Sequence, residues 1–263
     1  MIYDLSEVPK NHIVSKTVDI CIVGGGTAGV YLAQNFLNDN LNVIVVEMGD
    51  LHSEDAKSAF TEPNYLKQKY MGSLLGRVSG LGGTSAKWGG QMIPLSDSDF
   101  SRINNDTNKQ AWPIDFNELD EYYQRVEKSL NIEDPVNYSF ANSKVSKLIL
   151  DTKLAKFFSF RSSTWIPFKV RNFAKAYKKK LSQSQIVNVW LNCSLKSTTG
   201  FTWLDSTLTK ATFDGKHGQK LVISSRVFVI TMGALESTKC ILGLVDSFGN
   251  KRKNNQPFCD HIS

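Results

Sequence analysis

Residues 19–29 read DICIVGGGTAG, and this stretch decides the fold. The apolar run at 19–23 ends at three consecutive glycines, which is typical of a buried strand that leads into a tight turn. The following segment, TAGVYLAQNFLND (27–39), places apolar side chains at helical spacing, and LNVIVVE (41–47) is a second run rich in β-branched residues. Strand, glycine turn, helix and strand make one βαβ unit, so the sequence predicts an α/β fold with a parallel sheet.

The glycines of this turn form a G-x-G-x-x-G motif made by Gly24, Gly26 and Gly29. The first glycine permits the tight turn, the second lets the backbone approach a pyrophosphate, and the third lets helix and strand pack closely. The helix that begins at Thr27 offers free N–H groups and the positive end of its dipole to phosphates. Glu47 ends the second strand, where a carboxylate accepts hydrogen bonds from ribose hydroxyls and disfavours the 2′-phosphate of NADP. These five residues predict a dinucleotide-binding site.

A second glycine cluster, GGTSAKWGG, spans residues 82–90. Its four glycines flank small hydroxyl residues and one tryptophan, so its backbone can press against a flat ring system with N–H and hydroxyl groups pointing at it. The alternative is a glycine-rich surface loop. We expect this segment to fold back beside the helix that follows Gly26 and to contact the cofactor through Gly82, Gly83, Thr84, Ser85, Trp88, Gly89 and Gly90.

Beyond these motifs, the chain resembles the glucose–methanol–choline oxidoreductases, in particular their sugar-oxidising, pyranose-oxidase-like and gluconate-dehydrogenase-like branch. The matching segments are GGTSAKWGG (82–90), PLSDSDF (94–100), WPIDFNELDEYY (112–123), VFVITMGALESTKCIL (227–242) and FCDHIS (258–263). They occur in the order of the family. Residues 138–165 match poorly.

The resemblance implies a Rossmann-like FAD-binding domain of the glutathione-reductase type. In the family, the strand-glycine-helix element that here contains Gly233 closes over the cofactor, and His261 falls in the Asp-His segment, near the flavin. Some relatives bind FAD covalently through a histidine where this sequence has Lys87, so we expect noncovalent FAD. The implied reaction is oxidation of an alcohol, often a sugar hydroxyl: a base takes the hydroxyl proton while hydride passes to the flavin.

The resemblance also places the catalytic pair of the family, a histidine with a second histidine or an asparagine, in a C-terminal substrate half. The sequence ends at Ser263, so we expect that half to be absent, assign no catalytic residue, and expect no turnover and weak FAD binding by this chain alone. One alternative is a noncatalytic or decayed nucleotide-binding module, or a subunit completed by a second chain. Another is an NAD-linked Rossmann dehydrogenase, for which the second glycine cluster would have to be irrelevant.

The expected organisation is an N-terminal arm over 1–17 and an FAD-binding domain over 18–263, with an inserted helical region at about 95–182 and a β-meander around 195–226. A helix is predicted over 115–130, where Asp115 and Glu118 form a capping-box pattern. Its apolar face would contain Leu119, Tyr122, Tyr123, Val126 and Leu130. The basic stretch 161–181 either contacts an acidic partner or membrane, or is a solvated helix packed through Phe173, Tyr177 and Leu181; we favour the second interpretation.

Composition limits the function classes. A net charge of +6 favours anionic ligands but is too small to indicate nucleic acid. The four cysteines lack a C-x-x-C pair or histidines at metal-ligand spacing, so we expect reduced, structural thiols and no metal site. No apolar segment is long enough to cross a membrane and no signal peptide is visible, so we expect a cytoplasmic protein. A small-molecule alcohol or sugar is the expected partner, while a separate electron acceptor, a complementing chain and the oligomeric state stay open.

Overall fold

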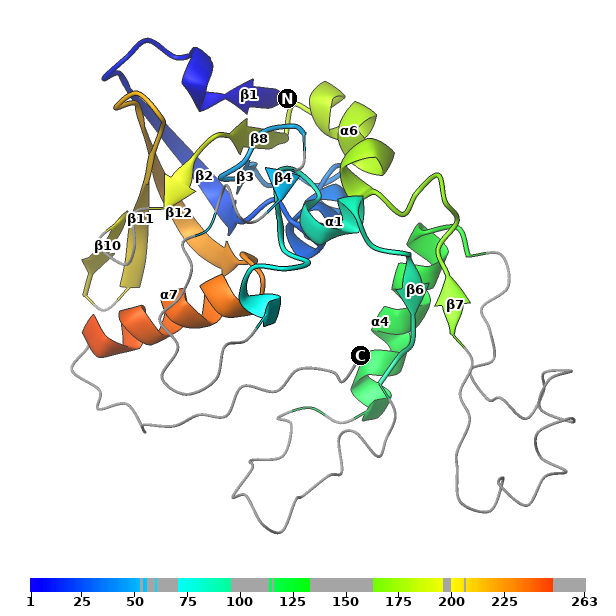
Figure 1. Cartoon of the computed structure of the whole chain (residues 1–263). Helices are drawn as coiled ribbons and strands as arrows, with labels where there is room; N and C mark the ends of the chain where they lie inside the picture. The colour runs from blue at the N-terminus through cyan, green and yellow to red at the C-terminus, as the bar shows by residue number, and fades with distance from the viewer. Residues whose placement is uncertain are drawn as a thin grey trace, which may run out of the picture. The chain divides into compact units, whose positions relative to one another are not determined.

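The computed structural model describes residues 1–52, 54–55, 60, 71–95, 114, 116–132, 163–195, 200–205 and 207–247 (Figure 1). The chain divides into two compact units. The first consists of Met1–Lys87 together with Asn172–Ser263, and the second of Trp88–Arg171. The second unit overlaps the inserted region of about 95–182 expected from the sequence, and the helix that begins at Phe173 belongs to the first unit.

The first unit is built on a sheet to which the described residues contribute eight strands, in the order β1-β8-β3-β2-β12-β11-β10, with β9 paired to β11. Its strands are β1 (Ile2–Asp4), β2 (Ile13–Val23), β3 (Val43–Val46), β8 (Val187–Leu191), β9 (Ser194–Leu195), β10 (Phe201–Leu204), β11 (Thr207–Asp214) and β12 (Lys220–Ile230). Neighbours from β1 to β12 in this order are parallel, and the outer pairs are antiparallel. The predicted βαβ unit and β-meander are therefore both present.

Strand β2 is longer than the apolar run that predicted it. It begins at Ile13 rather than Asp19, because its first residues pair with β12 from Lys220 onward. These first residues are mostly exposed, whereas Cys21, Ile22 and Val23 are buried. Hydrophobicity therefore revealed only the part of the strand that is covered on both faces.

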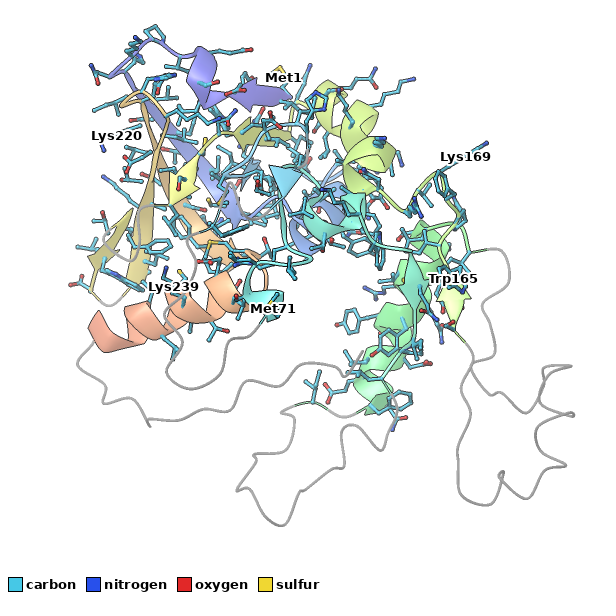
Figure 2. All side chains as sticks on the ribbon, in the orientation of Figure 1. Met1, Met71, Trp165, Lys169, Lys220 and Lys239 are labelled. Carbon is cyan, nitrogen blue, oxygen red and sulfur yellow. The ribbon has the colours of Figure 1, made fainter. Side chains whose placement is uncertain are left out.

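The N-terminal residues, expected to form an arm over 1–17, also contribute to the sheet. Strand β1 pairs with β8 at one edge. The Met1 ammonium group (labelled in Figure 2) donates hydrogen bonds to the carbonyl oxygens of Leu181, Ser184 and Val187 at 2.9, 2.7 and 2.8 Å. Because a cation is favourable at the C-terminal end of a helix, these bonds stabilise the end of the helix that contains Leu181.

Two helices, α1 (Thr27–Asn35) and α6 (Phe173–Gln183), lie side by side against β2, β3 and β8 (Figure 1). Helix α6 buries Phe173, Ala174, Tyr177 and Leu181. The four lysines of this helix, Lys175, Lys178, Lys179 and Lys180, are exposed. The interpretation of the basic stretch as a solvated helix packed through its apolar face is therefore confirmed for the described residues.

The main hydrophobic cluster includes Cys21, Val23, Ile44 and Val46 from the parallel strands, and Phe213, Leu221 and Ile223 from the antiparallel ones. Cys240 and Leu244 of helix α7 (Ala234–Ser247) pack against it. The cysteines of the described residues are free and buried, and burial raises the pKa of the Cys21 and Cys193 thiols. These thiols are structural, as expected.

The second unit contains the strand pair β6 (Gln91–Met92) and β7 (Thr164–Trp165), and helix α4 (Phe116–Ser129). The helix predicted over 115–130 is thus present, while its expected N-cap, Asp115, lies outside the described residues. Leu130 is buried, but Tyr122 of the predicted apolar face is exposed, with the Arg125 guanidinium 5.4 Å from the centre of its ring.

The remaining short elements are β4 (Glu54–Asp55), which pairs with β5 (Val78–Ser79), and three 3₁₀ turns, η1 (Leu5–Glu7), η2 (Met71–Ser73) and η3 (Gly83–Ala86). Among the described residues, no helix combines the length and apolar character that crossing a bilayer requires.

We predict that Phe213→Ala lowers the free energy of unfolding by about 3–5 kcal/mol, because the fully buried ring would leave a cavity in the main cluster. Urea unfolding followed by circular dichroism measures this loss. Leu204→Ala is the control: its side chain is 65% exposed, so the loss should stay within about 0.5 kcal/mol. Equal losses in the two variants would contradict the assigned core.

Candidate functional site

The glycine motif lies in the turn between β2 and α1, and Glu47 directly follows the neighbouring parallel strand β3. This is the arrangement predicted from the spacing. Gly24 has φ +109°, and a Cβ there would lie 2.6 Å from the carbonyl oxygen of Thr231. Its amide donates to the carbonyl oxygen of Val46 at 2.8 Å. A residue with a side chain fits neither this backbone angle nor this space.

The other two glycines of the motif differ in their surroundings. A Cβ on Gly29 would overlap the carbonyl oxygen of Gly24, so this glycine lets the helix pack directly on the turn. A Cβ on Gly26 would meet its nearest atom, the Thr231 carbonyl oxygen, only at 3.9 Å. Gly26 has φ −72°, which any residue adopts. Its lack of a side chain therefore leaves open space beside the N-terminus of α1, which suits a phosphate group.

Glu47 is 6% exposed and makes more contacts than the sequence indicated. Its Oε2 accepts from the Gly25 amide at 2.8 Å, and its Oε1 accepts from the amides of Gly49 and Gly80 at 2.9 and 3.0 Å. These bonds connect three segments that are distant in sequence. Because an ionised carboxylate has about four acceptor positions, capacity for a ribose hydroxyl remains beside them.

The second glycine segment reaches the same turn. The Gly82 amide donates to the Gly25 carbonyl oxygen at 2.7 Å, and the Thr27 hydroxyl donates to the Gly82 carbonyl oxygen at 3.4 Å. A Cβ on Gly83 would lie 2.9 Å from the Cα of Gly26. The prediction that this segment folds back beside the start of α1 is confirmed for Gly82 and Gly83.

The hydroxyl residues of the segment have different surroundings. Ser85 is buried; its hydroxyl donates to the Gly82 carbonyl oxygen at 2.6 Å and accepts from the Phe173 amide at 3.1 Å. These bonds join the segment to the start of α6, so Ser85 shapes the loop. The neighbouring Thr84 is exposed. Of the two, Thr84 is the hydroxyl residue that is accessible to a ligand.

Trp88, Gly89 and Gly90 belong to the second unit. The Trp88 indole donates to the Arg171 carbonyl oxygen at 2.7 Å, and the Ile166 amide donates to the Gly90 carbonyl oxygen at 2.8 Å. Gly90 has φ +87°. These contacts hold together the two chain segments that enter and leave that unit. A role of these three residues in cofactor binding stays a prediction.

A third turn follows β12, whose last residues pair with the end of β2. The Thr231 hydroxyl donates to the Gly24 carbonyl oxygen at 2.8 Å, which ties this turn to the first. Gly233 has φ +79° and precedes α7, and among the described residues no atom outside its chain neighbours lies within 4 Å of the position that a Cβ would take. The turns after β2 and β12 thus lie side by side at the carboxyl ends of neighbouring parallel strands, where open α/β sheets bind ligands.

Sequence reasoning missed three residues of this arrangement: Gly49, Gly80 and Thr231. A Cβ on Gly49 would overlap the backbone of Gly80, so the two glycines allow their segments to cross. Single glycines just after a strand, as in VVEMGD (45–50) and RVSGLGG (77–83), are the signal that could have pointed to them. Thr231 carries no such signal, because its role depends on the pairing of β2 with β12.

His261, which the sequence placed near the cofactor, lies outside the described residues. Within the described part of the chain, no group of three or more His, Cys, Asp or Glu residues could hold a metal ion.

No protein-family model and no curated protein matches the chain. Among solved structures it is similar to pyridoxine 4-oxidase from Mesorbium loti, with 18% identity over 85% of this chain and 51% of that chain, and a TM-score of 0.55. A weaker similarity, with a TM-score of 0.44, is to THI4 of Thermovibrio ammonificans, with 11% identity over 89% of this chain and 64% of that chain. Another, with a TM-score of 0.43, is to an L-amino acid deaminase from Proteus vulgaris, with 15% identity over 90% of this chain and 58% of that chain.

The chain therefore spans about half the length of the pyridoxine 4-oxidase chain that it matches. At this identity the similarity concerns the fold. Together with the strand order, it shows a mixed α/β, Rossmann-like domain with a parallel sheet and an antiparallel meander, as the sequence predicted.

The two motif glycines with different surroundings give a matched test. We predict that Gly26→Ala leaves the free energy of unfolding within about 0.5 kcal/mol of the parent. It should weaken ADP binding at least tenfold, because the added methyl group takes the space that suits a phosphate; a tenfold loss is about the value of one hydrogen bond to a charged group. Gly29→Ala should instead destabilise the fold by about 3 kcal/mol, because its Cβ overlaps the Gly24 carbonyl oxygen. Urea unfolding and calorimetric titration measure the two effects. Unchanged ADP affinity in a folded Gly26→Ala chain would contradict the phosphate assignment.

Proposed function

We propose that this chain binds FAD noncovalently and acts in an oxidoreductase of the glucose–methanol–choline type that oxidises an alcohol. The observation that carries the proposal is the meeting of two glycine segments and one buried carboxylate at the N-terminus of α1. The Gly82 amide donates to the Gly25 carbonyl oxygen at 2.7 Å, and the Glu47 carboxylate accepts from the amides of Gly25 and Gly80. An N-terminal helix end, a close glycine backbone and a carboxylate at the end of the next strand are what the ADP half of a dinucleotide requires.

FAD is favoured over the nicotinamide dinucleotides by the second glycine segment. A site for NAD alone needs only the β2–α1 turn and Glu47. Here residues 80–83 are buried, Gly82 bonds to that turn, and the next residue, Thr84, is exposed. The family resemblance assigns such a segment to the flavin ring. The similarity in fold to pyridoxine 4-oxidase agrees with a role in oxidation.

The chemistry that FAD supplies when bound is acceptance of a hydride from the substrate carbon. The residues of this chain would bind and orient it: Gly26 and the first amides of α1 would hold the pyrophosphate, Glu47 would accept from the ribose, and Lys87 cannot form the covalent histidyl link of some relatives. The residue that takes the proton of the substrate hydroxyl is not assigned among the described residues. We propose an alcohol as the substrate class and a sugar hydroxyl as its preferred member.

We predict that the purified chain binds one equivalent of FAD, that ADP competes with it, and that FMN does not, because recognition is through the ADP half. Quenching of flavin fluorescence measures the binding, and denaturation followed by filtration should release all of the flavin. Binding of NAD without FAD would favour the nicotinamide alternative. Binding of none of these ligands would refute the dinucleotide site.

Redox function needs a separate measurement. Anaerobic mixing of the FAD-loaded protein with aldoses, sugar alcohols and pyridoxine tests whether an alcohol reduces the flavin. Because the resemblance assigns the catalytic pair to no residue of this chain, we predict that the visible flavin absorbance of the chain alone stays unchanged. Chemical reduction by dithionite is the positive control for a redox-active flavin. Bleaching by one of these alcohols would show that the chain itself contains the residue that takes the hydroxyl proton, and would contradict the expectation of no turnover by this chain alone.

A further inference from the structure

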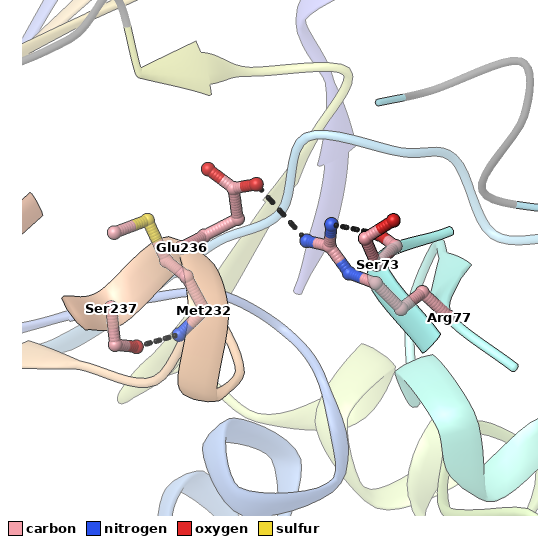
Figure 3. Close-up of polar contacts among 5 residues, drawn as sticks. All are labelled: Ser73, Arg77, Met232, Glu236 and Ser237. Carbon is pink, nitrogen blue, oxygen red and sulfur yellow. Dashed lines mark hydrogen bonds and ion pairs between the residues drawn. The ribbon is translucent and has the colours of Figure 1, made fainter. Parts of the chain in front are cut away.

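Arg77 forms a compact cluster with Ser73 and Glu236 (Figure 3). Its Nη1 donates to the Ser73 carbonyl oxygen at 3.0 Å, and its Nη2 lies 3.1 Å from Oε1 of Glu236. The guanidinium also lies 3.7 Å from the centre of the Phe60 ring. Both nitrogens at the end of the guanidinium group and one of its faces are thus engaged, which orients this planar cation more firmly than a single ion pair would.

The position of Arg77 in the chain gives this cluster its significance. Arg77 immediately precedes β5, and three consecutive hydrogen-bonded amides follow it: Gly80 to Glu47, Leu81 to the Asp50 carbonyl oxygen, and Gly82 to the Gly25 carbonyl oxygen. The arginine therefore anchors the upstream end of the segment that lies over the dinucleotide turn.

Glu236 anchors the other side. It lies in the first turn of α7, three residues after Gly233. The Ser237 hydroxyl accepts from the Met232 amide at 3.1 Å, so the turn between β12 and α7 is braced from within (Figure 3). The ion pair thus joins Arg77, just upstream of the second glycine segment, to the start of α7 beside the Gly233 turn. The Thr231 hydroxyl joins that turn to Gly24.

The cation of this pair is more sheltered than that of the Lys220–Asp214 pair, whereas the two carboxylates are similarly exposed. The side chains of Arg77 and Glu236 are 19% and 31% exposed, whereas those of Lys220 and Asp214 are 45% and 29% exposed. Exposed pairs contribute little, because water and salt screen them. The Arg77 cation is sheltered and is already held by the Phe60 ring and the Ser73 carbonyl oxygen. Forming its ion pair therefore costs less side-chain entropy, and salt screens the pair less.

We propose that the Arg77–Glu236 ion pair is a clasp that holds the Gly80–Gly82 segment against the glycine turns and thereby slows dissociation of the dinucleotide. This inference rests on the proposed function for its ligand. A pyrophosphate at Gly26 would be bordered by the segment that contains Gly83, because a Cβ on Gly83 would lie 2.9 Å from the Cα of Gly26. Release requires that segment to move, and the clasp restrains its upstream end. Arg77 is a positioning residue in this account and does not contact the ligand.

A double-mutant cycle tests the clasp. The variants are Arg77→Met, which keeps an apolar stem over Phe60, Glu236→Gln, and the two together, with Arg77→Lys as the conservative variant. Each single substitution should speed FAD dissociation about three- to tenfold, and the double variant should resemble the singles, because the second change removes nothing further. Arg77→Lys should restore part of the retention. If Arg77 contacted the phosphates directly, the losses in the double variant would multiply, which would overturn the proposal.

Hydrogen exchange in the ligand-free chain gives an independent readout. The amides of Gly80, Leu81 and Gly82 should exchange faster by a similar factor in Arg77→Met, Glu236→Gln and the double variant, while the amides of β3 stay unchanged. Lys220→Gln is the matched control, since it breaks an ion pair at the opposite end of β12. Unchanged exchange at Gly80–Gly82 would refute the clasp. If FAD fails to bind while exchange responds as expected, the clasp stands and the proposed ligand is wrong.

Discussion

The arrangement of the site depends on one buried carboxylate. Glu47 is almost fully removed from water, and an unpaired carboxylate in that position would be strongly unfavourable. The amides of Gly25, Gly49 and Gly80 offset that cost by donating to it. Because the three amides come from three separate segments, satisfying one side chain brings the turn after β2, the turn after β3 and the second glycine segment together.

Close backbone approach makes this convergence feasible. Gly24 lies against Thr231, Gly49 against Gly80, and Gly83 against Gly26, each at a distance that leaves no room for a Cβ. The glycines therefore serve two purposes at this edge of the sheet. Most of them let protein segments touch one another, whereas Gly26 leaves space open at the start of α1, where a phosphate binds most favourably.

The fold alone does not determine the function, because one fold supports many reactions and the reaction depends on the residues of the site. The similarity to pyridoxine 4-oxidase at 18% identity establishes the arrangement of strands and helices. The proposal of FAD rests on the residues at the N-terminus of α1, and the proposal of an alcohol rests on the resemblance of the sequence motifs. Arg77 and Glu236 add a feature that neither source indicates: an ion pair that, as we propose, restrains the segment beside the glycine turns.

The sequence by itself determined the βαβ unit, the roles of Gly24 and Gly29 and the place of Glu47, because these follow from local periodicity and from the needs of a tight glycine turn. The expected return of Gly82 to the first turn rested instead on the composition of the second glycine cluster, whose backbone can press against a flat ring. Only the tertiary structure decided that β2 begins at Ile13, that β1 joins the sheet, and that Thr231 and Arg77 support the site. Those features depend on partners far away in the sequence, on β12, β8 and α7, and no local pattern records such pairings. The same reason explains Ser85: its hydroxyl suggested a ligand contact, but the fold places the Phe173 amide within its reach.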